Sequence, residues 1–193
     1  MQIKNGNPPN APAICGNCGD PARLHVYDIE SRNSVKVTHL CEKCAKDYLS
    51  KPGAGPRRAM SSSEVEVDVC RIVINDVAPE QILYFREVDG ERGLPFVLGI
   101  YEATSILRML EGERTSRPLT HEAWLLTIET IGGKVAESAI TRLVDRTYHA
   151  ELRIANQSEI VRVDVRPSDA VAIALKANAP ILIKAELLPE VAS

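Results

Sequence analysis

Two pairs of cysteines near the start of the chain carry its clearest chemical signal. Cys15 and Cys18 form one Cys-x-x-Cys turn, Cys41 and Cys44 form another, and 22 residues separate the two turns. Each turn can place two thiolates on one metal ion, and a hairpin between the turns would complete the tetrahedral four-sulfur shell that structural zinc prefers. Four thiolates leave no position for a substrate or a catalytic water. The pattern therefore predicts a structural Zn²⁺ site.

The alternative for these cysteines is two disulfide bridges, and the redox compartment decides between the two interpretations. Residues 1–13 are polar and proline-rich, without the apolar core of a secretory signal, and no apolar run approaches the roughly 18 residues of a membrane span. We therefore expect a cytoplasmic protein with no membrane association, in which reduced thiolates bind zinc. His25 and His39 are alternative ligands, although four thiolates already fill the shell.

A second group of polar residues lies late in the chain, where a strand-like segment meets a helix start. The valines of this segment fall on one face, while Arg162, Asp164 and Arg166 share the other. Ser168 and Asp169 follow a proline at the start of the helix. Arginines beside free helix amides could hold a phosphodiester, and either aspartate could bind a divalent cation such as Mg²⁺. A surface ladder of charges, with Asp169 as a helix cap, explains the same residues equally well.

Two further helix starts carry residues that could do chemistry. Glu102 lies in the opening turn of one expected helix, directly after a strand, and Arg117 and His121 flank the start of the next helix. An arginine and a histidine beside free backbone amides could bind phosphate and transfer a proton. The alternatives are a carboxylate that stabilises the helix dipole and a histidine that is simply exposed.

The cysteine pairs enclose an expected hairpin, followed by a short helix. Alternating apolar and polar residues predict strands over 24–29 and 35–40, with a helix over 42–49. A segment of this size buries too little apolar surface to fold alone, so the metal must contribute to its stability. Residues 50–63 are rich in Pro, Gly and Ser and predict a flexible linker that lets the segments on either side reorient.

The rest of the chain predicts an α+β domain with a mixed β-sheet and three main helices. Strands dominate its beginning and end, and the helices do not alternate with them one for one. The expected strands are 65–74, 81–88, 94–99, 135–145, 147–155, 159–166 and 181–184, and the expected helices are 101–110, one that begins after Thr120 as N-cap and ends at 132–133, and one that begins at Pro167.

The charge is unevenly distributed along the chain. Residues 1–63 carry nine Lys or Arg and five Asp or Glu, a net charge of +4, whereas residues 64–193 carry fourteen and twenty-one, a net charge of −7. Nucleic-acid binding normally needs a basic surface, because neutralised phosphates release counterions. A phosphate site in the larger part must therefore be a local arginine cluster, a carboxylate-bound metal, or both.

The segments 117–121 and 163–175, with sequences RPLTH and VDVRPSDAVAIAL, resemble the bifunctional nuclease domain family, as does the upstream stretch 94–103. The likeness covers residues 64 to about 188. It implies hydrolysis of both DNA and RNA, a mixed α+β fold and homo-oligomers. The positions that match the family's motifs are Glu102, Arg117, His121, Asp145, Arg166, Ser168 and Asp169.

The cysteine segment is similar to the zinc-binding N-terminal module of the bacterial activator of protein-arginine kinase. The likeness rests on residues 15–22, with sequence CGNCGDPA, on His25 and on residues 39–45, with sequence HLCEKCA. We therefore predict a zinc ribbon at 15–49, after a disordered start at 1–14. The linker at 50–63 would join it to a nuclease-like domain at 64–193.

We interpret the chain as a nuclease without sequence preference, acting on phosphodiester bonds of DNA and RNA. The predicted catalytic residues are Glu102, His121, Asp164 and Asp169; Arg117, Arg166 and Ser168 are predicted to bind substrate, and Cys15, Cys18, Cys41 and Cys44 to bind Zn²⁺. The alternative is a non-catalytic regulatory module whose zinc ribbon docks a partner protein. The acidic balance and an aromatic content of 4%, which leaves few rings for base stacking, favour that alternative.

Overall fold

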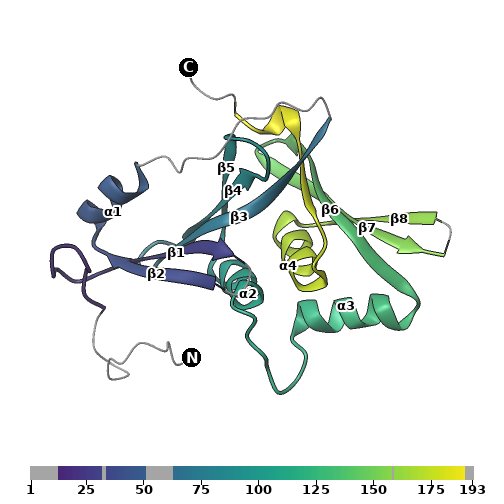
Figure 1. Cartoon of the computed structure of the whole chain (residues 1–193), viewed down its shortest axis with the longest axis horizontal. Coiled ribbons are helices and arrows are strands. Elements are labelled where there is room, and N and C mark those ends of the chain that lie inside the picture. Colours follow the sequence, from purple (N-terminus) through teal and green to yellow (C-terminus); the bar gives the residue numbers. More distant parts are fainter. Residues whose placement is uncertain (1–12, 32–33, 51–62, 158, 190–193) are drawn as a thin grey trace.

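A computed structural model describes residues 13–31, 34–50, 63–157 and 159–189 of the chain. Its described part holds nine strands and four α-helices (Figure 1). The strands are β1 Leu24–Ser31, β2 Ser34–Leu40, β3 Glu64–Asn75, β4 Glu80–Glu87, β5 Gly93–Gly99, β6 Gly133–Val144, β7 Thr147–Asn156, β8 Glu159–Val165 and β9 Ile181–Lys184. The helices are α1 Glu42–Leu49, α2 Ile100–Leu110, α3 Thr120–Thr130 and α4 Pro167–Ala177, with a 3₁₀ turn at Ala185–Leu187.

One mixed sheet contains all of these strands, with β3 as its central member. The order β2-β1-β3-β9-β6-β7-β8 is antiparallel except for the parallel pair β6 and β9, while β4 pairs with β3 and with β5. The start of β3 pairs with β9, and its end pairs with β1. An irregularity between Val69 and Arg71 marks the change and bends the strand. The predicted α+β class with a mixed sheet and three main helices is confirmed.

The cysteine segment is part of this sheet in the structure. Residues 24–28 of β1 pair with residues 71–75 of β3, and Arg71 forms an ion pair with Asp28. The Arg71 guanidinium also lies 5.2 Å from the centre of the Tyr48 ring on α1. The linker composition predicted that the cysteine segment could reorient relative to the larger domain. The structure instead shows the two paired through β1 and β3. The start at 1–14 and the linker itself lie largely outside the described residues, and the domain boundaries stay a prediction.

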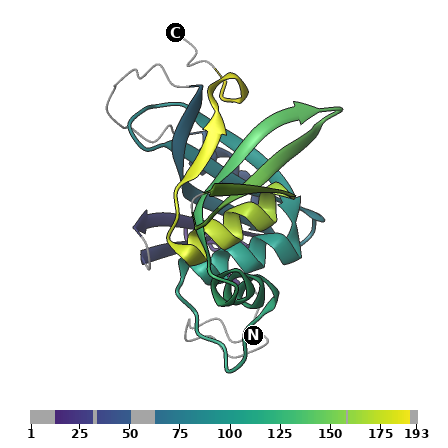
Figure 2. The ribbon, with the colours of Figure 1, turned by 90° about the vertical axis from the view of Figure 1, so that its right-hand side faces the viewer.

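Helix α4 lies at the centre of the core because it is apolar on nearly all sides. Its residues 170–174 are at most 1% exposed, and they pack with the inner faces of the sheet and with α2 and α3. Figure 2 shows α4, α2 and α3 gathered against the curved sheet. This packing brings the starts of the three helices toward the same side of the molecule.

Helix α3 begins one residue earlier than the sequence predicted. Leu119, not Thr120, is the N-cap, and Thr120 is the first helical residue. The reason is that Glu122 supplies the cap: its Oε2 accepts a hydrogen bond from the Leu119 N–H at 3.0 Å. In the part of the chain described, none of the helices has the length and hydropathy to cross a membrane.

Candidate functional site

The four cysteines of the two Cys-x-x-Cys turns lie together as the sequence predicted. Their Sγ atoms all lie within 4.8 Å of one another. Hydrogen bonds from backbone amides of Cys41 and Asn17 lower the pKa of the Cys15 thiol to about 6, so this sulfur is a thiolate at neutral pH. The Asn17 side-chain N–H lies 3.4 Å from Cys44 Sγ and can donate to it. Four converging sulfurs with amide donors around them fit a structural zinc ion.

His25 and His39 are not part of this four-sulfur group. Their Nδ1 atoms lie 2.6 Å apart, and His25 Nε2 lies 2.9 Å from a carboxylate oxygen of Asp76, directly after β3. Burial lowers the pKa of His39. The two histidines therefore link the cysteine segment to the end of β3 and do not serve as the alternative zinc ligands.

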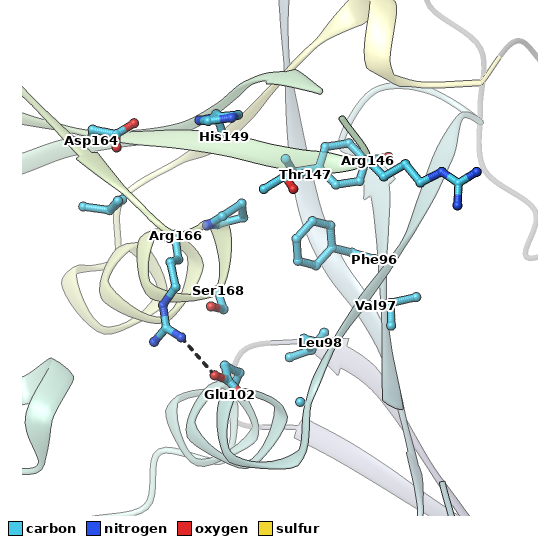
Figure 3. A pocket seen from close by; sticks show the side chains of 14 residues that line it. Phe96, Val97, Leu98, Glu102, Arg146, Thr147, His149, Asp164, Arg166 and Ser168 are labelled. Atoms are coloured by element: carbon cyan, nitrogen blue, oxygen red, sulfur yellow. Dashed lines mark hydrogen bonds and ion pairs between the residues drawn. The ribbon is translucent and has the colours of Figure 1, made fainter. Parts of the chain in front are cut away.

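A cleft of about 620 Å³ lies in the larger domain, and no cysteine lines it. One wall comes from the end of β5 and the start of α2, and the other from β7, the end of β8 and the start of α4 (Figure 3). Of the predicted site residues, Glu102, Asp164, Arg166 and Ser168 line it. Its size is typical of small-molecule and cofactor sites.

A chain of contacts joins the starts of α2, α3 and α4 beside this cleft. His121 Nε2 lies 3.1 Å from Asp169 Oδ1, and Arg166 Nε donates to Asp169 Oδ2 at 2.9 Å. Arg166 Nη1 donates to Glu102 Oε1 at 3.2 Å (Figure 3). Four of the predicted residues, separated by up to 67 positions in the sequence, are thus brought into contact.

The charge state of Asp169 follows from these contacts. Burial alone would raise the pKa of its carboxyl, but hydrogen bonds from Arg166 and His121 outweigh the burial and lower that pKa. Asp169 is therefore ionised at neutral pH with both oxygens engaged. It holds the Arg166 side chain, which is 68% exposed, at the mouth of the cleft.

Ser168 and Glu102 lie where two helix starts face the cleft. Ser168 is only 9% exposed as a residue, but its hydroxyl is not a buried unpaired group and is open to the cleft. Helices α2 and α4 have no side-chain cap at Gly99 and Arg166, so their first amides are not satisfied by those side chains. A Cβ at Gly99 would lie 2.6 Å from Glu102 Oε2, which shows how closely the carboxylate folds back over the helix start.

The other predicted residues do not take part in the contacts between the starts of α2, α3 and α4. Asp164 is exposed on β8 and lines the cleft, with no ion pair to any described residue. Arg162 shares its face but donates to Glu151 Oε1 at 2.7 Å, away from the cleft. Arg117 is exposed before α3, outside the cleft lining, and Asp145 sits in the β6–β7 turn with φ of 47°.

Sequence reasoning missed four residues that line the cleft: Phe96 on β5, Arg146 in the β6–β7 turn, and Tyr148 and His149 on β7. The hairpin itself was predictable from its two-residue turn. What could not be read from the sequence is that β5 faces β7. The Phe96 and Tyr148 rings lie 5.1 Å apart between centroids.

Comparison with known proteins gives this cleft a context. A family model described as the bifunctional nuclease domain matches residues 83–193, a range that contains every residue lining the cleft. An uncharacterized protein of Mycobacterium tuberculosis is 34% identical over 125 residues, covering 65% of this chain and 74% of that protein. Bifunctional nuclease 1 of Arabidopsis thaliana is 30% identical over 113 residues, covering 56% of this chain and 34% of the plant protein. Bifunctional nuclease 2 of Oryza sativa subsp. japonica is 29% identical over 120 residues, covering 59% of this chain and 36% of that protein.

Proposed function

Because the chain belongs to the bifunctional nuclease domain family, we propose that it hydrolyses phosphodiester bonds of both DNA and RNA without sequence preference. The relatives whose names carry this activity are about three times longer than the matched segment, so the activity of this chain is a proposal. The family match covers the cleft and leaves the cysteine segment outside, so the reaction is assigned to the cleft.

Ser168 is the observation that carries the proposal. Its hydroxyl lines the cleft, is open to water there and can donate to a bound oxyanion. Ser168 lies in the first turn of α4, where its own backbone N–H and the helix dipole can stabilise an anion, while Pro167 has no N–H and the Asp169 and Ala170 amides donate to the Arg166 carbonyl. Arg166 at the same helix start adds a guanidinium that matches phosphate geometry. A phosphate at this point would contact all three.

The cleft carboxylates supply the other requirement of hydrolysis, an activated water. Glu102 and Asp164 both line the cleft, and either could act as a general base. Within the described residues, no group of three or more acidic or histidine ligands is preformed there. A Mg²⁺ ion held by one carboxylate and by substrate phosphate oxygens would lower the pKa of a bound water. His149 lines the same cleft and is a further candidate for proton transfer.

His121 and Asp169 contribute through Arg166 in this proposal. Both were predicted as catalytic from the sequence, yet neither lines the cleft, and their contacts lead to the Arg166 guanidinium. We assign them the role of positioning residues. Arg117, which lies outside the cleft lining, would contact a more distant phosphate of a long substrate.

A second candidate function keeps the same fold without catalysis. The net charge of −7 on residues 64–193 opposes nonspecific binding of a polyanion. In that case the cysteine segment, like the module of the activator of protein-arginine kinase that it resembles, would dock a partner protein. Under either proposal the protein would be cytoplasmic and homo-oligomeric.

Turnover by the full-length protein separates the two candidates. Single-stranded DNA, duplex DNA and RNA would be incubated with and without added Mg²⁺, since a chelator would also strip the cysteine site. The nuclease proposal expects cleavage of DNA and RNA, and expects Arg166→Gln to lower kcat/KM by about 100-fold, as loss of one anion-stabilising donor typically does.

Lys134→Gln is the matched control because it removes the same charge from an exposed position outside the cleft. It should leave turnover within about twofold of the parent protein. Absence of turnover on all substrates, alongside an active reference nuclease, would favour the regulatory module.

A further inference from the structure

Two aromatic rings form part of the cleft between its charged ends. Phe96 on β5 is 8% exposed and supports Tyr148 on β7, whose side chain is half-buried; the interplanar angle of the pair is 51°. Aromatic content is low in this chain, with two phenylalanines in all, so a ring pair inside the cleft is a specific feature. Nucleic-acid bases stack on such rings whatever their sequence, because every base has a π-face.

Two arginines, Arg166 and Arg146, line the cleft on opposite sides of Phe96. Arg166 projects from the start of α4, and Arg146 projects from the β6–β7 turn beyond Phe96 (Figure 3). Arg146 has φ of 63°, in the left-handed region, and the pairing of Val144 with Thr147 holds it in that turn. The backbone therefore fixes where this side chain begins, and in Figure 3 the side chain extends away from Arg166. An aromatic platform with a cation on either side matches one base and its two flanking phosphates.

The size of the cleft limits what can reach the rings. A volume of about 620 Å³ suits a ligand of nucleotide dimensions. A duplex keeps its bases stacked inside the helix and must extrude one before that base can stack on a protein ring. We propose that the cleft binds single-stranded nucleic acid, with one base against Tyr148 and the flanking phosphates on Arg166 and Arg146. This deepens the proposed nuclease function and rests on it for the choice of nucleic acid as ligand.

The charges of the cleft predict how strongly the binding of a single strand depends on salt. Glu102 and Asp164 also line the cleft and repel a polyanion, so affinity depends on stacking more than on phosphate contacts. Neutralising two phosphates on a single strand gives a slope of log Kobs against log salt of about −1.4, at roughly 0.7 for each phosphate. Removing Arg146 should reduce that slope by half.

Fluorescence anisotropy with the full-length protein tests this proposal. Labelled single-stranded DNA, single-stranded RNA of the same sequence and the DNA duplex would be titrated without added Mg²⁺. Both single strands should bind at least tenfold more tightly than the duplex. Tyr148→Leu should weaken single-strand binding about tenfold, whereas Tyr148→Phe should stay within twofold because the ring is kept.

Arg146→Gly provides a variant that does not disturb packing. Glycine adopts positive φ readily, so the turn should fold at least as well as in the parent protein. The salt slope should fall to about −0.7 in this variant, and Lys134→Gln, which removes the same charge elsewhere on β6, should leave the slope unchanged. A melting curve confirms that each variant is folded.

Equal affinity for duplex and single strand would overturn the proposal, as would single-strand binding that is unaffected by both Tyr148→Leu and Arg146→Gly. These failures differ from failure of the nuclease function. Ring-dependent single-strand binding without turnover would leave this inference standing and remove catalysis. Turnover with no preference for single strands would support the nuclease function and overturn this inference.

Discussion

Asp169 shows how a residue can position a side chain of the cleft without lining the cleft itself. Its two oxygens accept from Arg166 and face His121 Nε2, so the carboxylate fixes the direction of the arginine and joins α3 to α4. The sequence identified the residue through its place at a helix start, where a carboxylate also caps the helix. The predicted cap is not observed: Asp169 lies in the first turn of α4, but its carboxylate contacts the side chains of Arg166 and His121, and α4 has no side-chain cap hydrogen bond.

Replacing Asp169 by asparagine should destabilise the protein by about 1–2 kcal/mol at pH 7, since charge-assisted hydrogen bonds to Arg166 and His121 are weakened. The pKa of this carboxyl is lowered in the folded state from its ordinary value of 3.8. Its contribution to stability is therefore complete above that value and is lost as the pH falls through the lower folded pKa. Urea denaturation at pH 7 and near pH 3 should show a gap between parent and variant that narrows in acid.

Asp164→Asn is the control for this measurement. Asp164 lines the same cleft but has no ion pair with a described residue, so its replacement should change the unfolding free energy by less than about 0.5 kcal/mol. An equal loss of unfolding free energy in Asp169→Asn and Asp164→Asn would show that the contacts of Asp169 contribute nothing specific to stability.

At the scale of elements, a buried arginine ties the strands together. Arg153 on β7 is 7% exposed and donates to Glu64 on β3 at 2.6 Å, to Glu137 on β6 at 2.7 Å, and to its strand neighbour Glu151. Hydrogen bonds from Arg153 lower the pKa of Glu64. The cluster holds the start of β3 against the β6–β7 hairpin that carries Arg146 and Tyr148. It thereby fixes one wall of the cleft.

Arg153→Met should cost about 3–5 kcal/mol of unfolding free energy at pH 7, because three carboxylates lose the buried guanidinium that they share. Since Glu64 has a lowered pKa in the parent protein, its stabilising contribution is present above its ordinary value of 4.5 and disappears in acid. The difference between variant and parent should therefore shrink as the pH falls below that value. Chemical denaturation across pH 3–7 measures it.

Arg162→Met tests whether burial explains the large loss of unfolding free energy expected for Arg153→Met. Arg162 contacts Glu151 as well, but its side chain is 61% exposed, and exposed ion pairs contribute less than about 1 kcal/mol. A loss for Arg162→Met as large as that for Arg153→Met would contradict the explanation.

At the scale of the whole molecule, strand β3 belongs to the larger domain and also pairs and packs with the cysteine segment. Val73 of β3 packs in the same apolar cluster as Cys15, Cys44 and Val26. Residues 71–75 of β3 also pair with β1. Loss of the metal should therefore affect β3 and not only the segment that binds it.

Cys41→Ser should abolish stoichiometric zinc binding, because three thiolates no longer close the shell, and structural zinc contributes about 10–16 kcal/mol to folding of such segments. Hydrogen exchange should then speed up in β1, β2 and the end of β3, while α4 in the core stays protected. Elemental analysis gives the zinc content, and peptide-resolved exchange gives the location.

Cys70→Ser is the matched control, since Cys70 lies outside the four-sulfur group. It should retain one equivalent of zinc and the parent exchange pattern in β1 and β2. Unchanged protection at the end of β3 in Cys41→Ser would mean that the two parts fold independently of the metal.

The sequence by itself determined the features that depend on residues close together in the chain. The Cys-x-x-Cys turns, the helix starts at Glu102 and Pro167, and the alternation that puts Asp164 and Arg166 on one face of β8 all follow from local geometry, which repeats every few residues. The strand and helix bounds were predicted to within a few residues for the same reason. Even the one-residue error at Thr120 was local, since it came from the capping carboxylate of Glu122.

Only the tertiary structure decided which of these local features meet. The pairing of β1 with β3, the parallel pairing of β9 with β6, and the approach of β5 to β7 join residues far apart in the sequence. Such pairings depend on strand register and on how apolar faces pack around α4, and no short pattern encodes them. That is why Glu102 and His121 could be named from the sequence and its family resemblance, whereas their contact chain, the Phe96–Tyr148 wall and Arg146 could be found only in the folded molecule.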